Sequence, residues 1–232
     1  MPPADTGRFE YWAGVDTPAV GGSALREFDR FYSTVHVPEV LAYYPGMLSC
    51  ARYRLTEQDE RGDRGPMWLA RYTMDEHAAA RYRTVNSDPG FVMPFTPMPL
   101  SERDFDVRWR FLWRSLASYG DDAGTSRGVR LIGMDPAPGT RAEELTAFNA
   151  FYDRTHLREA RGALRSRFVT RYELCQAFSS SAAPRYAAVY ELDSPAVTNL
   201  PVPRVTDGPP SWRDRNTHWR LTYALIERID RG

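Results

Sequence analysis

Apolar residues recur at spacings of three and four positions in two distant stretches of the chain. The first stretch holds Leu25, Phe28, Phe31, Tyr32 and Val35. The second stretch repeats the spacing with Leu145, Phe148, Phe151, Tyr152 and Thr155. Because an α-helix has 3.6 residues per turn, this spacing places the side chains on one helical face. The pattern therefore predicts an amphipathic helix in each stretch.

Segments rich in β-branched and aromatic residues surround these two helices, and this composition is typical of strands. The expected strands are Phe9–Val15, Gly46–Leu55, Pro66–Met74, Arg108–Leu116, Gly128–Met134, Arg167–Leu174, Arg185–Leu192 and His218–Ile226. A further helix is predicted at Asp75–Val85, with a short counterpart at residues 194–200. Each half of the chain then has the order strand, helix, strand, strand, helix, strand.

The two halves of the chain repeat each other. FDRFYSTVHVPEVL in the first half shares the spacing of its Phe, Phe-Tyr and His with FNAFYDRTHLREAR in the second. Further landmarks keep the same order, such as ARYRL with TRYEL and WLARY with YAAVY. We interpret the repeat as a tandem duplication of a unit of roughly 110 residues. The expected units are residues 1–120 and 128–232, joined by the Gly-rich and Asp-rich linker Gly120–Gly128.

The order βαββαβ is that of a ferredoxin-like α+β unit, whose antiparallel sheet carries both helices on one face. The other face of the sheet is uncovered in a single unit. Two units can bring these faces together and close a barrel with the helices outside. We therefore expect one chain to form a pseudo-dimeric α+β barrel from its two halves. A homodimer of whole chains is left open.

Composition and charge exclude several classes of function. The chain has 30 basic and 30 acidic residues, so a general affinity for nucleic acid has no support. Every basic residue is Arg, which excludes Schiff-base chemistry on Lys. No stretch approaches the roughly 18 apolar residues of a membrane span, and the N-terminus lacks a basic region followed by an apolar run. We expect a cytoplasmic protein with no membrane partner.

The segment FYSTVHVPEVLAYYPGMLSCARYRL resembles a segment of EthD-like proteins in the dimeric α+β-barrel superfamily. In that family a helix with Tyr, His and Pro-Glu runs through a Pro-Gly turn into the second strand. The matching positions are Tyr32, His36, Pro38, Glu39, Pro45 and Gly46. The resemblance implies the barrel fold over nearly the whole chain. It does not imply one activity, because this fold hosts isomerases, decarboxylases, dehydratases, polyketide cyclases, cofactor-free oxygenases, haem enzymes and binding proteins.

His36 is the strongest candidate for a catalytic residue. A neutral imidazole can accept or donate a proton at physiological pH, and Tyr32 lies one helical turn earlier on the same face. Glu39, three residues later, is positioned to orient His36 or to stabilise its charge. The duplicated pair Tyr152 and His156 are candidate substrate-binding residues. The alternative is that both histidines only cap the last carbonyls of a helix.

The fourth strand of each half offers a second set of candidates. Arginines alternate with aromatic residues in Arg108–Leu116, and His218–Ile226 alternates in the same way. The candidate substrate-binding residues are Arg108, Trp109, Arg110 and His218. If the cationic face points into the barrel, it is suited to bind a carboxylate, phenolate or enolate. If it points outward, it is an ordinary solvated face.

The aromatic residues either line a cavity for a flat polycyclic ligand or fill the core. The Pro-rich loop Asn86–Asp104 favours a cavity, because its apolar side chains suit a lid more than a solvated linker. Phe95 of this loop is therefore a further candidate for substrate binding. Packing against a second chain is the alternative for this loop and for its counterpart Pro201–Asn216.

Motifs for nucleotide, serine-hydrolase and zinc chemistry are missing from the sequence, so no metal site is expected. Haem needs only one axial His, and the superfamily includes haem proteins, so haem is left open although no cofactor is our first expectation. The first functional hypothesis is a cofactor-independent isomerase, cyclase or dehydratase-type lyase that moves a proton on an aromatic or polyketide-like metabolite. The second is an oxidative enzyme of the same fold, either a cofactor-free monooxygenase or a haem enzyme. The third is a non-catalytic ligand-binding barrel.

The two halves differ near the candidate histidines. Pro38 restricts the residue before it and is expected to end or bend the first helix, which fixes the direction of His36. Arg158 stands at the matching place and lets the second helix continue, so that His156 is aimed differently. We therefore expect one dominant cavity, with polar groups mainly from the first half.

Overall fold

The computed structural model describes residues 8–17, 21–60, 62–101, 104–121, 126–194 and 206–232. The first half contains β1 (Phe9–Asp16), α1 (Gly22–Phe31), the π-helical turn η1 (Tyr32–His36), α2 (Val37–Tyr43), β2 (Met47–Gln58), β3 (Trp68–Met74), α3 (Glu76–Asn86) and β4 (Asp106–Gly120). The second half contains β5 (Gly128–Asp135), α4 (Ala142–Phe151), the π-helical turn η2 (Tyr152–His156), α5 (Leu157–Ala163), β6 (Phe168–Ala177), β7 (Tyr186–Leu192), α6 (Pro210–Arg213) and β8 (Asn216–Asp230).

The eight strands form one closed barrel in the order β1-β3-β2-β8-β5-β7-β6-β4. Each half contributes four neighbouring strands, and the halves join where β2 pairs with β8 and β4 pairs with β6. All neighbouring strands are antiparallel. The predicted α+β fold, an intrachain barrel built from two βαββαβ halves, is confirmed.

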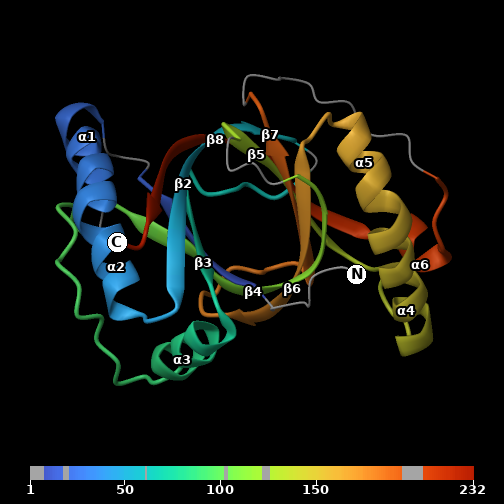
Figure 1. The fold of residues 1–232 in the computed structure, drawn as a ribbon, viewed down its shortest axis with the longest axis horizontal. Helices are drawn as coiled ribbons and strands as arrows, with labels where there is room; N and C mark the ends of the chain where they lie inside the picture. Colours follow the sequence, from blue (N-terminus) through green and yellow to red (C-terminus); the bar gives the residue numbers. More distant parts are fainter. Residues whose placement is uncertain (1–7, 18–20, 61, 102–103, 122–125, 195–205) are drawn as a thin grey trace.

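The helices lie outside the barrel on two opposite sides (Figure 1). The helices α1, α2 and α3 cover the sheet of the first half, and α4, α5 and α6 cover that of the second. The short helix predicted at residues 194–200 lies outside the described residues except for Ser194. Part of the expected linker, residues 122–125, also lies outside them, so the boundaries of the two units stay a prediction. No helix in the described part of the chain is long and apolar enough to cross a membrane.

Successive side chains along each strand point alternately into the barrel and toward the helices outside it. One buried cluster draws residues from both halves, including Trp12, Trp109, Trp113 and Trp219, and fills the interior. The other two clusters lie under the helices of one half each. The aromatic residues thus form both the barrel core and the packing of the helices.

Two glycines allow the barrel to close tightly at one end. A Cβ on Gly14 would lie 2.5 Å from the ring of Pro66, and one on Gly133 would lie 2.6 Å from the indole of Trp219. At this end Trp109 stacks on Trp219 with their ring centres 4.3 Å apart. The interior is therefore packed where β1 and β5 end, and any internal cavity has to lie toward the opposite end.

Candidate active site between helix and sheet

The Tyr-His pair of each half lies on a π-helical turn within a longer helix. In η1 the Val37 N–H donates to the carbonyl of Tyr32, five residues earlier, and η2 has the same arrangement. Such widened turns occur often at functional sites. The ring centres of Tyr32 and His36 lie 4.8 Å apart, and those of Tyr152 and His156 lie 5.2 Å apart.

Pro38 was expected to end or bend the first helix; the end is wrong, because the helix continues to Tyr43, and the bend stays a prediction. Pro38 lies in the first turn of α2, directly after the π-helical turn. The second half forms the same turn with Arg158 at this position, so proline does not cause it. The backbone angles of His36 and His156 are nearly equal, at φ −62°, ψ −51° and φ −62°, ψ −45°. Neither histidine is at a helix end, which removes the capping alternative.

A cavity of about 50 Å³ lies beside His36, between the helix and the outer face of the sheet. It is walled by β1, β3, the helix through η1, α3 and the loop that follows α3. The lining residues are Tyr11, Ala13, Tyr32, His36, Val40, Tyr44, Tyr72, Tyr82, Met93 and Phe95. Three of the predicted site residues, Tyr32, His36 and Phe95, therefore meet at one cavity. Sequence reasoning missed the other four tyrosines, although all four lie in segments predicted as strands or helices or in the turn that follows the first helix.

His36 is a neutral imidazole in this environment. Burial lowers its pKa to about 4; the carboxylate of Glu39 acts against this shift, and Arg52 adds to it. The buried Nδ1 atom has no hydrogen-bond partner among the described residues. The edge of the Phe95 ring meets the imidazole with the ring centres 5.6 Å apart. His36 can therefore accept a proton or a hydrogen bond from a bound ligand.

The phenols of Tyr32, Tyr72 and Tyr82 are also neutral. Burial raises the pKa of Tyr32, of Tyr72 and of Tyr82 well above the usual value. The hydroxyl of Tyr72 is buried and lies beside the hydroxyl of Tyr32 and the thiol of Cys50. A neutral phenol in this position can donate to an oxygen on which negative charge develops.

Arg110 lies behind the cavity and supports its wall. Its Nη2 donates to Asn86 Oδ1 at 2.6 Å, and its Nε donates to the Tyr11 hydroxyl at 3.4 Å. Asn86 in turn donates from Nδ2 to the Tyr44 hydroxyl at 3.0 Å. The side chain points away from the barrel interior but is covered by α3 rather than solvated. Arg110 thus positions two lining tyrosines without lining the cavity itself.

Glu39 holds the loop over the cavity. Its carboxylate accepts hydrogen bonds from the backbone N–H of Thr96, at 2.9 Å, and from the Thr96 hydroxyl. The second half has the same contact between Glu159 and Thr206. Glu39 still acts on His36 through its charge, but its direct partner is the loop that carries Phe95. This contact links two segments far apart in the sequence, so the sequence held no signal for it.

Replacing Glu39 by Gln is expected to loosen this loop. The substitution keeps an oxygen acceptor but removes the charge, and hydrogen bonds to charged groups are stronger than those between neutral groups. We expect the Thr96 amide to exchange about 5- to 10-fold faster in hydrogen-exchange NMR. Glu159→Gln is the matched control and should affect only the Thr206 amide. Equal Thr96 exchange in wild type and Glu39→Gln would show that the contact does not hold the loop.

The remaining candidates of the fourth strands lie away from the His36 cavity. Arg108 pairs with Asp16 at 3.0 Å and binds backbone carbonyls of the loop before β3. Trp109 belongs to the barrel core. His218 contacts Asp135 at 2.8 Å and Asp63 at 3.3 Å, near the ends of the strands. The cationic face therefore points outward, and its residues join loops to the barrel.

Trp212 covers the equivalent place in the second half. Its ring centre lies 4.2 Å from that of His156 and 5.1 Å from that of Tyr152. Trp212 belongs to the short helix α6 and is fully buried. Burial also lowers the pKa of His156, to about 3. The Tyr-His pair is thus present in both halves, but in the second half an indole occupies the space beside it.

A buried arginine under each helix was not identified from the sequence. Arg52 bonds Asp29 at 2.7 Å and lies 4.8 Å above the ring of Tyr32. Arg171 bonds Asp153 at 2.7 Å and lies 4.3 Å above the ring of Tyr152. Both occur at the same place in the repeated segments ARYRL and TRYEL, which was the available signal. Each guanidinium packs against the tyrosine ring of its Tyr-His pair from the side of the sheet.

The two buried histidines make stability depend on pH. The pKa is about 4 for His36 and about 3 for His156 in the folded chain, against about 6.5 in an unfolded chain. Between these values the unfolded chain binds more protons, so the free energy of unfolding falls as the pH falls below 6.5. We expect His36→Gln to reduce the loss between pH 7 and pH 5 by on the order of 1 to 2 kcal/mol, measured by urea unfolding.

His77 on α3 is exposed and provides the matched control for this experiment. His77→Gln should leave the difference between pH 7 and pH 5 as in wild type. Equal pH dependence in wild type and His36→Gln would contradict the burial of a neutral His36.

The four histidines do not fit haem in this conformation. The space beside His36 is much smaller than a haem macrocycle, and Trp212 covers His156. His77 is exposed on α3, and His218 is bound by two aspartates. In the described part of the chain, no group of three His, Cys, Asp or Glu side chains is arranged to hold a metal ion.

Comparisons with known proteins support the fold. No protein-family model matches the sequence, and the search of curated proteins finds no similar sequence. A crystal structure of an anthrone oxidase-like protein matches with a TM-score of 0.53 and 12% identity, over 99% of this chain and 95% of that chain. A protein assigned as a chlorite dismutase matches with a TM-score of 0.44 and 11% identity, over 96% of each chain. A protein assigned as a monooxygenase, from Fusobacterium nucleatum, matches with a TM-score of 0.43 and 9% identity, over 97% of this chain and 94% of that chain.

At 12% identity the likeness to the anthrone oxidase-like protein is one of fold, extending over nearly the whole length of both chains. The finer resemblance to EthD-like proteins stays a prediction. This chain therefore has the α+β-barrel fold of that solved structure.

Proposed function

We propose that this chain is an enzyme that removes a proton from a small enolisable aromatic molecule bound beside His36. The observation that carries the proposal is the neutral imidazole of His36 on the wall of an aromatic cavity, whose buried Nδ1 lacks a partner among the described residues. A positioned base of this kind typically accelerates proton transfer by about 100- to 10,000-fold. A neutral phenol such as Tyr72 would donate to the enolate or phenolate oxygen that forms.

Proton removal is the first step of each reaction in the leading hypothesis. Returning the proton to another atom gives isomerisation, expulsion of a leaving group gives dehydration, and attack on a second carbonyl gives cyclisation. All three need a base, an oxyanion donor and exclusion of water, and none needs a cofactor. The low pKa of His36 suits an acidic C–H or O–H group, because a weak base needs a substrate whose anion is well stabilised.

Substrate entry requires the loop over the cavity to move. A cavity of about 50 Å³ is smaller than the roughly 150 Å³ that holds benzene in another protein. Met93 and Phe95 line the cavity from the loop, and Met93 is 43% exposed, so displacing this loop opens the site to solvent. The contact between Glu39 and Thr96 is the point at which the loop is held closed.

Oxidation is the second candidate, and the anthrone oxidase-like neighbour favours it. The carbanion or phenolate left by proton removal is electron-rich and can react with molecular oxygen when the substrate is suitable. Proton removal by His36 would then be shared by both reactions. The two candidates differ in what happens after this step.

One assay separates the candidates. Anthrone is incubated with the protein in D2O without oxygen, and loss of its methylene signal is followed by proton NMR; an oxygen electrode then records uptake in air. Exchange above the rate without protein supports proton removal, and oxygen uptake adds the oxidative reaction. Retention of anthrone with neither result would support a binding protein instead. A Soret band in the purified protein that is lost on changing one His would overturn the cofactor-independent mechanism.

A further inference from the structure

The barrel has a second cavity at its open end, on the opposite face of the sheet from His36. Its volume is about 140 Å³, and it lies where β1, β2 and β6 begin and where β3, β4, β7 and β8 end. Glu10 and Arg71 line this cavity, whereas their chain neighbours Tyr11 and Tyr72 line the His36 cavity. The two cavities therefore share no residue and are separated by the thickness of one sheet.

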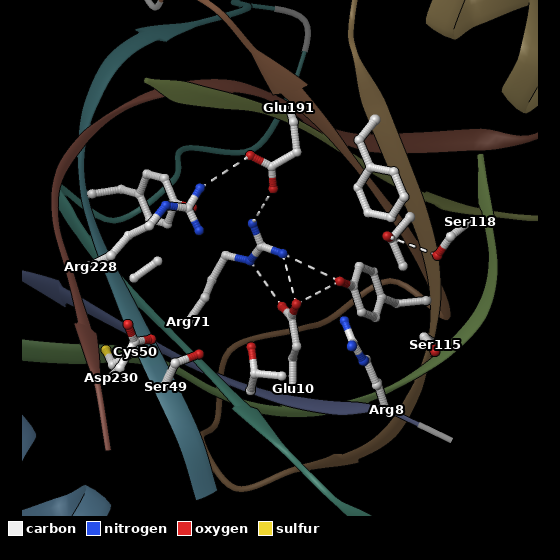
Figure 2. Close-up of a pocket in the computed structure, with 16 residues that line it drawn as sticks. Arg8, Glu10, Ser49, Cys50, Arg71, Ser115, Ser118, Glu191, Arg228 and Asp230 are labelled. Carbon is white, nitrogen blue, oxygen red and sulfur yellow. Dashed lines mark hydrogen bonds and ion pairs between the residues drawn. The ribbon is translucent and has the colours of Figure 1, made fainter. Parts of the chain in front are cut away.

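A buried ion-pair network forms the floor of this cavity (Figure 2). Arg71 donates to both carboxylate oxygens of Glu10, at 2.9 and 2.8 Å, and lies 3.4 Å from Glu191. Tyr172 and Trp12 each donate to Glu10 at 2.6 Å. The carboxylate of Glu10 thus accepts four hydrogen bonds and has no capacity for a ligand.

The charges that line the cavity balance. Arg228 lies 3.7 Å from Glu191 and donates to Ser126, which in turn donates to Glu191. Three arginines and three carboxylates line the cavity in total, namely Arg8, Arg71, Arg228, Glu10, Glu191 and Asp230. A charged ligand therefore gains nothing from the net charge of the lining, and at the floor it would have to break the pairs of Arg71 with Glu10 and Glu191, which is unfavourable.

The Tyr53 hydroxyl is the buried polar group that lacks a partner at this cavity. Tyr53 lines the cavity and is only 1% exposed, and its hydroxyl has no hydrogen-bond partner among the described residues. Burial raises the pKa of this hydroxyl. The Arg71 guanidinium lies 5.9 Å from the centre of the Tyr53 ring, so the side chain lies beside the network. The walls add hydroxyls of Ser49, Thr73, Ser115, Ser118 and Thr170.

We propose that this barrel-end cavity binds a small uncharged molecule rich in hydroxyl groups, about the size of one six-membered ring. A ligand hydroxyl both donates and accepts, so it matches the phenol of Tyr53, the serine and threonine hydroxyls and the carboxylate and guanidinium edges together. The volume of about 140 Å³ is close to the roughly 150 Å³ that holds a benzene ring elsewhere. The site is independent of the chemistry proposed at His36.

The test is a ligand-observed NMR titration of the full chain with myo-inositol, a neutral ring with a hydroxyl on each carbon. We expect saturable binding to wild type. Tyr53→Phe removes only the unpaired hydroxyl and should weaken binding by about 5- to 10-fold. Ser118→Trp places an indole at the exposed mouth of the cavity and should abolish binding.

Tyr186→Phe is the matched control, because Tyr186 also has a buried hydroxyl without a partner but lies under the helices of the second half. It should bind myo-inositol as wild type does. The proposal is overturned if wild type shows no saturable binding, or if acetate or glycine binds more tightly than myo-inositol. Binding that survives unchanged in both Tyr53→Phe and Ser118→Trp would also overturn it, because the ligand would then lie elsewhere.

Discussion

Replacing His36 by Ala is expected to lower the turnover of an enolisable aromatic substrate by about 100-fold or more. His36 is the only histidine that lines the cavity between the first helix and the sheet, within the described residues. Its imidazole is neutral at pH 7 because burial lowers its pKa to about 4. The variant leaves the aromatic wall in place, so binding should persist while proton exchange is lost. The rate of deuterium incorporation into anthrone measures this directly.

His156→Ala is the matched control for His36→Ala. Both histidines occupy the same position on a π-helical turn, where His156 is buried and His36 is partly buried, so the two substitutions change the same part of the helix. Trp212 fills the space beside His156, so we expect this variant to keep wild-type turnover once folding is verified by circular dichroism. Comparable losses from both substitutions would contradict a single active cavity. A loss confined to His156→Ala would place the site in the second half.

Replacing Arg71 by Met is expected to lower the free energy of unfolding by about 3 to 5 kcal/mol. Arg71 is 7% exposed and neutralises Glu10, which is also 7% exposed, inside the barrel. Methionine has a similar length but no charge, so the variant would leave Glu10 and Glu191 buried with less compensation. Breaking a buried pair by removing one partner is costly because the remaining charge is not solvated. Urea unfolding at pH 7 measures the change.

Arg114→Met is the matched control on the barrel surface. Arg114 pairs with Glu173 at 2.8 Å, but its side chain is 52% exposed. An exposed pair of this kind contributes about 1 kcal/mol or less. Adding Glu10→Gln to Arg71→Met should recover part of the lost stability, because it removes the unpaired carboxylate. Equal effects of Arg71→Met and Arg114→Met would show that the barrel network does not stabilise the fold.

The sequence by itself determined the fold class. Helical periodicity around Phe28 and Phe148 and alternation along Arg108–Leu116 are local patterns, and each is set by residues close in the chain. The repeat then required two equivalent halves, and a βαββαβ unit leaves one sheet face uncovered, so closure into a barrel followed. The order of helices and strands along the chain and the position of the Tyr-His pair on each first helix could be predicted for the same reason.

Only the tertiary structure decided which residues share a site. The alternation in β4 placed Arg108 and Arg110 on the same face but did not say whether that face was inward or outward. The partner of Glu39 is a loop more than fifty residues away in the sequence, and Trp212 reaches His156 from a similar distance.

The network of Glu10, Arg71 and Glu191 also could not be predicted from local sequence patterns. Glu10 and Arg71 lie on the neighbouring strands β1 and β3 of the first half. Glu191 lies on β7 of the second half, which comes close to them only when both halves close the barrel. Local patterns specify helices, strands and their buried faces, because those depend on neighbours in sequence. Cavities and buried ion pairs depend on which faces meet in space, and the closed barrel alone fixes that.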